Sequence, residues 1–153
     1  MRYAHTNIIA KDWQKLALFY QEVFACLPVP PQRDLHGDWL DKLTGVENAH
    51  IQGVHLRLPG YTKEAPTLEI FSYADEMPVA LLNDINTTGI GHLAFEVEDV
   101  QATLEKILSC GGSTLGELVT KEYPGLGTAC LVYCRDPEGN IIELQNWQKP
   151  TRK

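Results

Sequence analysis

Apolar residues recur at helical spacing in two stretches of the chain, residues 13–24 and 100–108. In both stretches they follow the i, i+3, i+4, i+7 pattern of a helix that buries one face. An aspartate stands directly before each stretch, Asp12 before the first and Asp99 before the second. Aspartate is a preferred N-cap because its side chain accepts a hydrogen bond from an amide of the first helical turn. The pattern therefore predicts two capped helices.

Strand-like segments surround both helices, either alternating between apolar and polar residues or continuously apolar. Residues 28–48 lack such a pattern and carry three prolines, so we interpret them as irregular, with a short helical turn within residues 36–46. Residues 136–140, Asp-Pro-Glu-Gly-Asn, predict a hairpin turn, because proline presets one backbone angle and glycine accepts a positive φ. The predicted strands are residues 3–10, 49–58, 67–73, 89–97, 113–121, 127–135 and 140–147.

These elements form an internal repeat. His5 and His92 each stand seven residues before the aspartate that caps the following helix. Each half then closes on a strand with a carboxylate at its centre, Glu69 in the first half and Glu143 in the second. The His-to-Glu separation is 64 residues in the first half and 51 in the second, and we assign the difference of 13 to an insertion within residues 28–48.

The repeat predicts an α+β fold built from two βαβββ modules. The modules cover about residues 1–74 and 89–148, and the polar residues 74–88 form the linker between them. At 153 residues the chain has the length of one domain, residues 1–153, and a domain of that size buries enough surface to be stable without disulfides.

The four repeated residues share a common setting on their strands. Side chains alternate between the two faces of a strand, so Glu69 points away from its aliphatic neighbours Leu68 and Ile70, and Glu143 is placed in the same way. Taken singly, such a glutamate can face solvent, and a histidine near a strand start is commonly structural. Two modules that face one another would bring two imidazoles and two carboxylates together, a ligand set suited to divalent transition metals.

The other three histidines have no counterpart in the repeat. We interpret His36 and His50 as surface or loop residues. His55 shares a strand face with Arg57 and is a candidate to line a cavity.

Composition narrows the class of protein. Thirteen basic and twenty acidic residues give a formal net charge of −7, which has the wrong sign for binding a nucleic-acid backbone. No run of 18 apolar residues and no signal-peptide pattern occurs, so we expect a cytoplasmic protein without a membrane segment. The four cysteines form no CxxC pair and are interpreted as reduced and structural: Cys26, Cys110, Cys130 and Cys134.

At this point the sequence resembles the vicinal oxygen chelate superfamily, also called the glyoxalase/bleomycin-resistance/dioxygenase superfamily. The most specific matching segments are residues 89–97, with Asp99 following, and residues 136–144. The resemblance implies that the paired βαβββ modules form a cupped mixed sheet around one divalent ion, Ni, Zn, Co, Mn or Fe. By position, the family's metal ligands correspond to His5, Glu69, His92 and Glu143.

The resemblance also implies a style of chemistry. Members similar to glyoxalase I and methylmalonyl-CoA epimerase remove a proton next to a carbonyl group and stabilise the resulting enediolate on the metal. We therefore expect a metal-dependent lyase or isomerase with a small-molecule substrate, in which Glu143 is ligand and base and Glu69 is ligand or second base. Candidate basic residues for a glutathione or CoA moiety are Arg33, Arg57, Lys121 and Arg135.

Two alternatives remain open. A binding protein of the same superfamily would keep the cavity without catalysis, although such members often lack the metal ligands. An extradiol-type dioxygenase would use His5, His92 and Glu143 alone, so that a ligand at Glu69 argues against it. Under each of these hypotheses, the leading one included, we expect a homodimer, because a second chain can cover the edges of the sheets. The modules then pair within one chain or between two chains.

Overall fold

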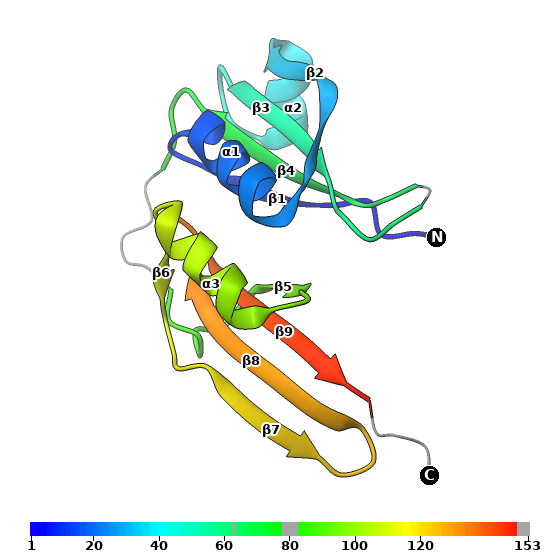
Figure 1. Ribbon diagram of the computed structural model, residues 1–153. Helices are drawn as coiled ribbons and strands as arrows, with labels where there is room; N and C mark the ends of the chain where they lie inside the picture. Colours follow the sequence, from blue (N-terminus) through cyan, green and yellow to red (C-terminus); the bar gives the residue numbers. More distant parts are fainter. Residues whose placement is uncertain (63, 78–82, 150–153) are drawn as a thin grey trace. The chain divides into compact units, whose positions relative to one another are not determined.

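The computed structural model describes residues 1–62, 64–77 and 83–149, which form two compact units, Met1–Val79 and Ala80–Lys153 (Figure 1). Each unit contains one mixed sheet with helical cover, so the α+β fold class is confirmed. The predicted linker, residues 74–88, includes residues 78–82, which lie outside the described residues. The single-domain assignment stays a prediction.

Among its described residues, the first unit contains four strands and two helices. Its sheet has the strand order β1-β4-β3-β2, in which β1 and β4 are parallel and the other pairs are antiparallel. The elements in chain order are β1 (His5–Ile9), α1 (Trp13–Phe24), β2 (Leu27–His36), α2 (Asp38–Thr44), β3 (His50–Arg57) and β4 (Thr67–Tyr73).

The second unit repeats this topology. Its sheet has the order β5-β9-β8-β6, with β5 and β9 parallel, and β7 also pairs with β8. The elements are β5 (Leu93–Glu96), α3 (Val100–Ser109), β6 (Ser113–Thr114), β7 (Val119–Tyr123), β8 (Gly127–Arg135) and β9 (Ile141–Gln148). The strand predicted for residues 89–97 is thus shorter and begins after His92.

Both predicted helix caps are confirmed. The Asp12 carboxylate accepts a hydrogen bond from the Lys15 amide at 3.1 Å, and Asp99 accepts one from the Ala102 amide at 2.9 Å. Helix α1 contacts β3 and β4, and α3 contacts β6, β8 and β9, so each helix covers its own sheet. Side chains that point away from the helices lie on the opposite face of each sheet.

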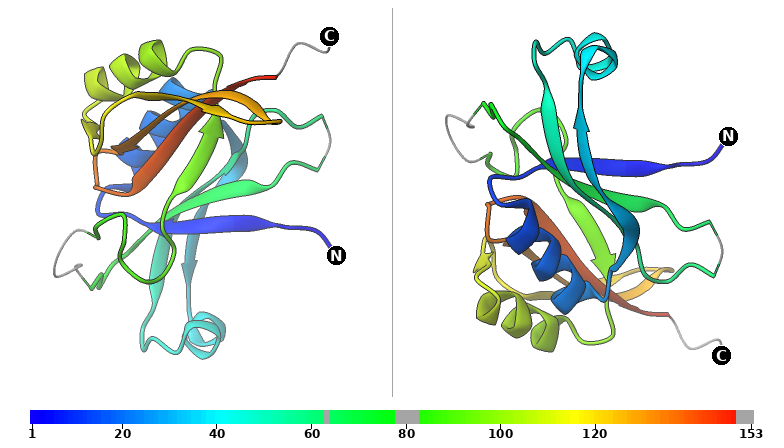
Figure 2. Two further views of the ribbon diagram at one scale, coloured as in Figure 1. Left: turned by 90° about the horizontal axis from the view of Figure 1, so that it is seen from below. Right: turned by 90° about the horizontal axis from the view of Figure 1, so that it is seen from above.

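The interpretation of residues 28–48 as irregular was wrong in its first part. Residues 27–36 form β2, an edge strand that pairs with β3, and its register shifts between Val29 and Arg33. Prolines lack an amide hydrogen, so a sheet tolerates them at an edge or a bulge, and Pro30 and Pro31 lie at that shift. The predicted helical turn is confirmed as α2, which lies at the end of the β2–β3 hairpin in both views of Figure 2.

The predicted strand at residues 113–121 is divided into β6 and β7. Both pair with β8, and between them residues 115–118 stand opposite Val132 and Tyr133. In the first unit, residues 30–32 stand opposite Val54. In both units the edge strand therefore has two more residues than the strand opposite it, which is a β-bulge. The internal repeat includes this bulge.

The length difference between the two halves has two sources. His5 and His55 are separated by 50 residues, whereas His92 and Tyr133, which have the same sheet positions, are separated by 41. The remaining four extra residues lie in the turn between β3 and β4. The prediction that residues 28–48 contain the whole insertion was therefore only partly right.

The hairpin turn at residues 136–140 is confirmed. Asp136 Oδ1 accepts hydrogen bonds from the amides of Glu138 and Asn140, at 2.9 and 3.0 Å. Gly139 has a φ of 94°, the left-handed conformation that its lack of a side chain permits. The turn fixes the register of β8 against β9.

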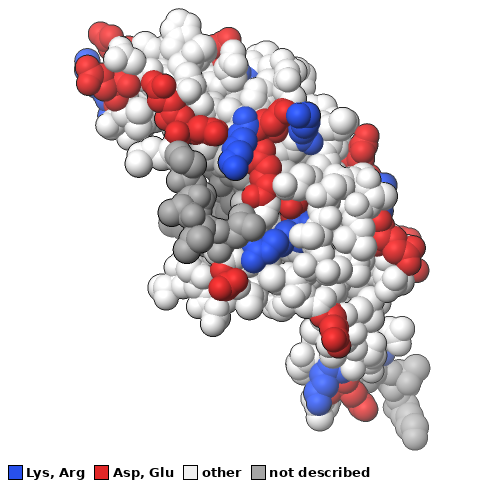
Figure 3. Space-filling view, turned by 90° about the vertical axis from the view of Figure 1, so that its left-hand side faces the viewer, with Lys and Arg blue, Asp and Glu red and all other residues white. Residues whose placement is uncertain are grey.

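Charged side chains of both signs are mixed on the face shown in Figure 3, where Lys and Arg lie among Asp and Glu. Among the described residues, no helix has the length and hydrophobicity needed to cross a bilayer.

Candidate functional site

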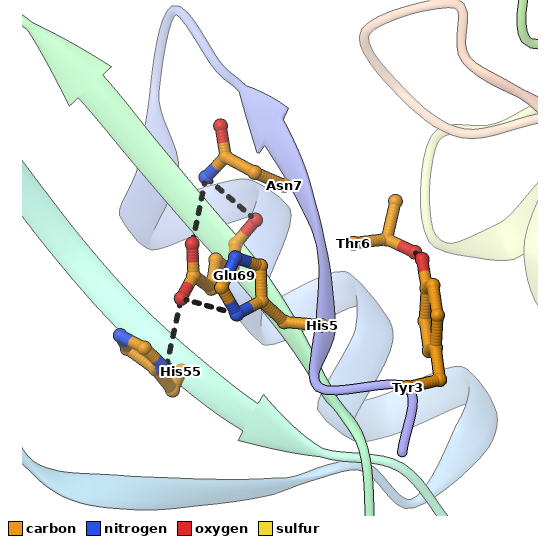
Figure 4. Close-up of polar contacts among 6 residues, drawn as sticks. All are labelled: Tyr3, His5, Thr6, Asn7, His55 and Glu69. Carbon is orange, nitrogen blue, oxygen red and sulfur yellow. Dashed lines mark hydrogen bonds and ion pairs between the residues drawn. The ribbon is translucent and has the colours of Figure 1, made fainter. Parts of the chain in front are cut away.

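Glu69 is the centre of a polar cluster in the first unit. Its neighbours Leu68 and Ile70 are buried on the helix side of β4, and Glu69 itself is only 8% exposed on the opposite face. Nδ1 of His5 and Nδ1 of His55 each lie 3.3 Å from Oε1 of Glu69 (Figure 4). Asn7 Nδ2 lies 3.5 Å from Oε2. Both carboxylate oxygens therefore have polar neighbours.

The strand register places these side chains around Glu69. Asn7 is the parallel-strand partner of Glu69, and His5 stands two residues earlier on the same face of β1. His55 is the antiparallel partner of Glu69 on the other side, in β3. The side chains of this cluster therefore come from three adjacent strands, β1, β4 and β3.

Glu143 is surrounded in a similar way in the second unit. Nε2 of His92 lies 2.9 Å from Oε2 of Glu143, and the Tyr133 hydroxyl donates a hydrogen bond to the same oxygen at 3.4 Å. The rings of His92 and Tyr133 meet edge to face, with their centroids 5.1 Å apart. The Glu143 side chain is 17% exposed, and the Glu69 side chain is 10% exposed.

The two clusters share one register. Ala94 is the parallel-strand partner of Glu143, and His92 stands two residues before Ala94, as His5 stands two residues before Asn7. Tyr133 is the antiparallel partner of Glu143, as His55 is of Glu69. Each module thus brings its predicted His and Glu together.

Sequence reasoning missed Tyr133 as a neighbour of the site. The signal was present in the hairpin turn, because counting outward from residues 136–140 pairs Arg135 with Ile141 and Tyr133 with Glu143. The prediction considered His55 only as a cavity residue, whereas its imidazole contacts the Glu69 carboxylate directly.

Burial shifts the pKa of each flanking side chain in the direction that favours its neutral form. The pKa of His55 is lowered, chiefly because burial disfavours the imidazolium, although the Glu69 carboxylate acts in the opposite direction. The pKa of the Tyr133 hydroxyl is raised, first by burial and then by the negative charge of Glu143. A neutral imidazole and a neutral phenol each retain one proton to donate.

An apolar cluster borders the Glu69 site on its own sheet face. Phe71 follows Glu69 on that face, and its ring lies 5.5 Å from the His55 ring, centroid to centroid. Leu40 of α2 packs in the cluster, so the inserted helix buries one end of this face. The members of the cluster are Leu35, Leu40, Ala49, Ile51, Phe71 and Tyr73.

Several other candidates have structural roles. Arg135 is buried and donates hydrogen bonds to the Gly139 and Asn83 carbonyl oxygens, so its proposed place at a pocket rim was wrong. His36 is exposed and His50 is partly exposed, as expected for surface residues, but both lie on strands rather than in a loop. They are cross-strand partners in β2 and β3, and His50 bonds to Asp34 at 2.6 Å. This hydrogen bond is the largest cause of the lowered pKa of Asp34.

Among residues 1–62, 64–77 and 83–149, no group of three or more His, Cys, Asp or Glu side chains is arranged to hold a metal ion. Each module by itself contributes two of the four predicted ligands, one imidazole and one carboxylate. The predicted set of four is therefore divided between the modules, and its assembly stays a prediction.

The topology and the repeated His–Glu pairs define a protein of paired βαβββ modules. A family model, the Glyoxalase/Bleomycin resistance protein/Dioxygenase superfamily, matches residues 2–144. The chain belongs to this superfamily, and the family expected from its sequence is confirmed.

Relatives and solved structures agree with this assignment. A probable lactoylglutathione lyase of Vibrio cholerae is 34% identical over 106 residues, which cover 61% of this chain and 72% of the relative. A glyoxalase family protein from Bacillus cereus is 19% identical, with a TM-score of 0.74 over 96% of this chain and 93% of that one. A fosfomycin resistance protein from Listeria monocytogenes, solved with Mn(II) and a dihydroxypropylphosphonic acid, has 17% identity and a TM-score of 0.55 over 96% and 93% of the respective chains.

Proposed function

We propose that this protein is a divalent-metal-dependent lyase or isomerase of the glyoxalase I type. The observation that carries the proposal is the repeated contact between an imidazole and a carboxylate, at 3.3 Å in the first module and 2.9 Å in the second. The relative named probable lactoylglutathione lyase supports the same reaction class. An acyl-CoA epimerase reaction uses the same proton abstraction and is the nearest variant of the proposal.

The donor chemistry fits a divalent transition metal. Two imidazole nitrogens and two carboxylate oxygens form a mixed N and O set, which suits Ni, Zn, Co, Mn or Fe. We propose that His5, Glu69, His92 and Glu143 bind one such ion, either within one chain or between the two chains of a homodimer. When bound, the ion supplies a Lewis acid for negative charge that develops on the substrate oxygens.

Glu143 is the better placed of the two carboxylates to act as base. Within the described residues, both contacts of Glu143 fall on Oε2, which leaves Oε1 for a proton from substrate. At Glu69, His5 and His55 occupy Oε1 and Asn7 approaches Oε2. We therefore assign Glu143 as ligand and base, and Glu69 as ligand and secondary base.

The reaction needs no oxidant. A carboxylate oxygen of Glu143 takes the proton from the carbon next to the substrate carbonyl and returns it to the adjacent carbon, so the product is an isomer of the substrate. For a hemithioacetal of a 2-oxoaldehyde and a thiol, the isomer is the thioester of a 2-hydroxy acid. Tyr133 lies on the same sheet face as Glu143 and donates a hydrogen bond to its Oε2.

Elemental analysis of protein purified without added metal or chelator tests the proposal. We expect about one equivalent of Ni, Zn, Co, Mn or Fe in the wild-type protein, and loss of that metal in His92→Ala. The metal-loaded protein should convert the hemithioacetal of a 2-oxoaldehyde and glutathione, followed by thioester absorbance. Protein that neither contains metal nor takes it up on titration would instead support a small-molecule binding protein of the same superfamily.

A further inference from the structure

His55 and Tyr133 occupy the same position of the repeat, and each lies against the carboxylate of its own module. We propose that they are a repeated pair of positioning residues, which hold the Glu69 and Glu143 carboxylates in the orientation that binds a divalent cation. The inference rests on the proposed function, but it concerns residues outside the four predicted ligands.

The first argument is the sheet register. A directly paired residue on an antiparallel neighbour has its side chain on the same face, about 5 Å away between Cβ atoms. His55 has this relation to Glu69, and Tyr133 has it to Glu143. Two different residue types thus reach the corresponding carboxylate from corresponding places in the repeat.

The second argument is the bulge in each edge strand. In the first module the register shift begins at Val29, the strand partner of His55. In the second module the amides of Leu115 and Gly116 both donate to the Tyr133 carbonyl oxygen, at 3.0 and 3.2 Å. A bulge increases local twist and redirects side chains, so its repetition beside His55 and Tyr133 favours a shared role in aiming them.

The third argument is that both rings are held in place. The His55 side chain is 22% exposed and lies against Phe71, with 5.5 Å between ring centroids. Tyr133 packs edge to face on His92 at 5.1 Å. A ring with a packing partner and a carboxylate contact has little rotational freedom, and it can therefore fix the carboxylate beside it.

The chemistry of the two contacts is the same. Each side chain places a group that can donate a hydrogen bond beside a carboxylate oxygen: Nδ1 of His55 lies 3.3 Å from Oε1 of Glu69, and the Tyr133 hydroxyl donates to Oε2 of Glu143 at 3.4 Å. Groups that hydrogen-bond a metal ligand commonly change metal affinity about 10- to 100-fold when they are removed. His55 and Tyr133 need not touch the ion to have this effect.

Cobalt affinity, measured by competition with a chromophoric chelator, tests the proposal. We expect His55→Phe and Tyr133→Phe each to weaken cobalt binding by about 10- to 100-fold. His55→Asn keeps an amide nitrogen near the position of Nδ1, so it should restore the affinity to within about threefold of wild type. Such a rescue would not follow from a merely structural role.

Two matched variants remove an imidazole ring or a tyrosine hydroxyl at positions away from the two glutamates. His50→Phe removes an imidazole from the same strand, where it bonds to Asp34. Tyr123→Phe removes a hydroxyl from the same sheet, where the Tyr123 ring packs on Trp147 at 5.3 Å. Both controls should bind cobalt as the wild type does, and thermal unfolding of every variant should show one cooperative transition.

The possible outcomes separate this proposal from the proposed function. Wild-type affinity in His55→Phe or in Tyr133→Phe would overturn the repeated pair. A wild-type protein that binds no cobalt would end the proposed function. The contact by which His55 orients the Glu69 carboxylate would then be tested by the position of the His55 ring proton. At pH 8, long-range ¹H–¹⁵N spectra should place the His55 proton on Nδ1, because an unprotonated nitrogen facing a carboxylate oxygen would repel it. A proton on Nε2 would overturn the positioning role.

Discussion

Nε2 of His92 lies 2.9 Å from Oε2 of Glu143, a closer contact than the 3.3 Å between Nδ1 of His5 and Oε1 of Glu69. Tyr133 adds its hydrogen bond to the same Glu143 oxygen. The two carboxylates therefore differ in how their oxygens are engaged, although the sheet register around them is the same. This difference leads to a prediction about their roles.

Glu143→Gln should lower the turnover number by about 10²- to 10⁴-fold, because an amide cannot accept the substrate proton. The variant should keep most of its metal, since an amide oxygen can still act as a ligand. Glu69→Gln should also keep most of its metal, for the same reason, and should lower the turnover number less than Glu143→Gln does, because Glu69 is only the secondary base. Steady-state kinetics with saturating metal, together with metal content, compares the two variants. Full turnover in Glu143→Gln would contradict its assignment as base.

The two N-caps should contribute comparably to stability. Removing a capping carboxylate leaves a first-turn amide without its partner, so Asp12→Ala and Asp99→Ala should each reduce the free energy of unfolding by about 1 kcal/mol. Urea denaturation followed by circular dichroism measures this change. Asp75→Ala, at an exposed turn residue after β4, is the control and should unfold as the wild type does.

Two of the four thiols should be unreactive in the native protein. Burial raises the pKa of both Cys26 and Cys134 to about 12, so at pH 8 both remain protonated, and the thiolate is the reactive form. Cys110 and Cys130 are partly exposed. A disulfide reagent should therefore modify two thiols rapidly and all four after unfolding in guanidinium chloride.

The Cys110→Ser/Cys130→Ser double variant provides the control for thiol reactivity. It should show no rapid phase in its native state, and its two remaining thiols should react on unfolding. Mass spectrometry of briefly labelled native protein identifies the modified residues. Rapid modification at Cys26 or Cys134 would show that these sites open far more readily than their burial implies.

The sequence predicted the fold best where the repeat could be checked against itself. Strand parity placed Glu69 and Glu143 away from their aliphatic neighbours, and the seven-residue spacing located both helix caps. The strand β2 was missed because prolines argue against a central strand, and the pattern of a single segment does not reveal an edge. Its bulge has a counterpart in the second module, but bulges have no simple pattern of apolar residues.

The candidate site was predicted in part. The pairing of each histidine with its glutamate follows from parallel strands, whose register the repeat duplicates. Tyr133 could not be predicted from its residue type, because a phenol is not among the usual ligands of these metals. Its place beside Glu143 follows only from the register of the hairpin. The joint binding of one ion by both modules depends on how they pair, which local patterns do not determine.

Gly53 lies where strands β3 and β4 leave no room for a side chain. A Cβ atom there would overlap the Ile70 carbonyl oxygen and the Phe71 ring, and both belong to the neighbouring strand. Gly53→Ala should therefore push β3 away from β4, at a cost of about 1–3 kcal/mol in unfolding free energy. Because His55 is two residues further along β3, the same shift should also weaken metal binding.

Gly116→Ala is the matched control for this substitution. It adds the same methyl group at a glycine where no atom beyond the adjacent residues lies within 4 Å of the new carbon. Urea denaturation of both variants and cobalt competition of Gly53→Ala separate the effects: we expect Gly53→Ala to lose stability and affinity together, and Gly116→Ala to keep wild-type stability. Wild-type affinity in Gly53→Ala, together with lower stability, would contradict the prediction. It would show that β3 can move without disturbing the contact between His55 and the Glu69 carboxylate.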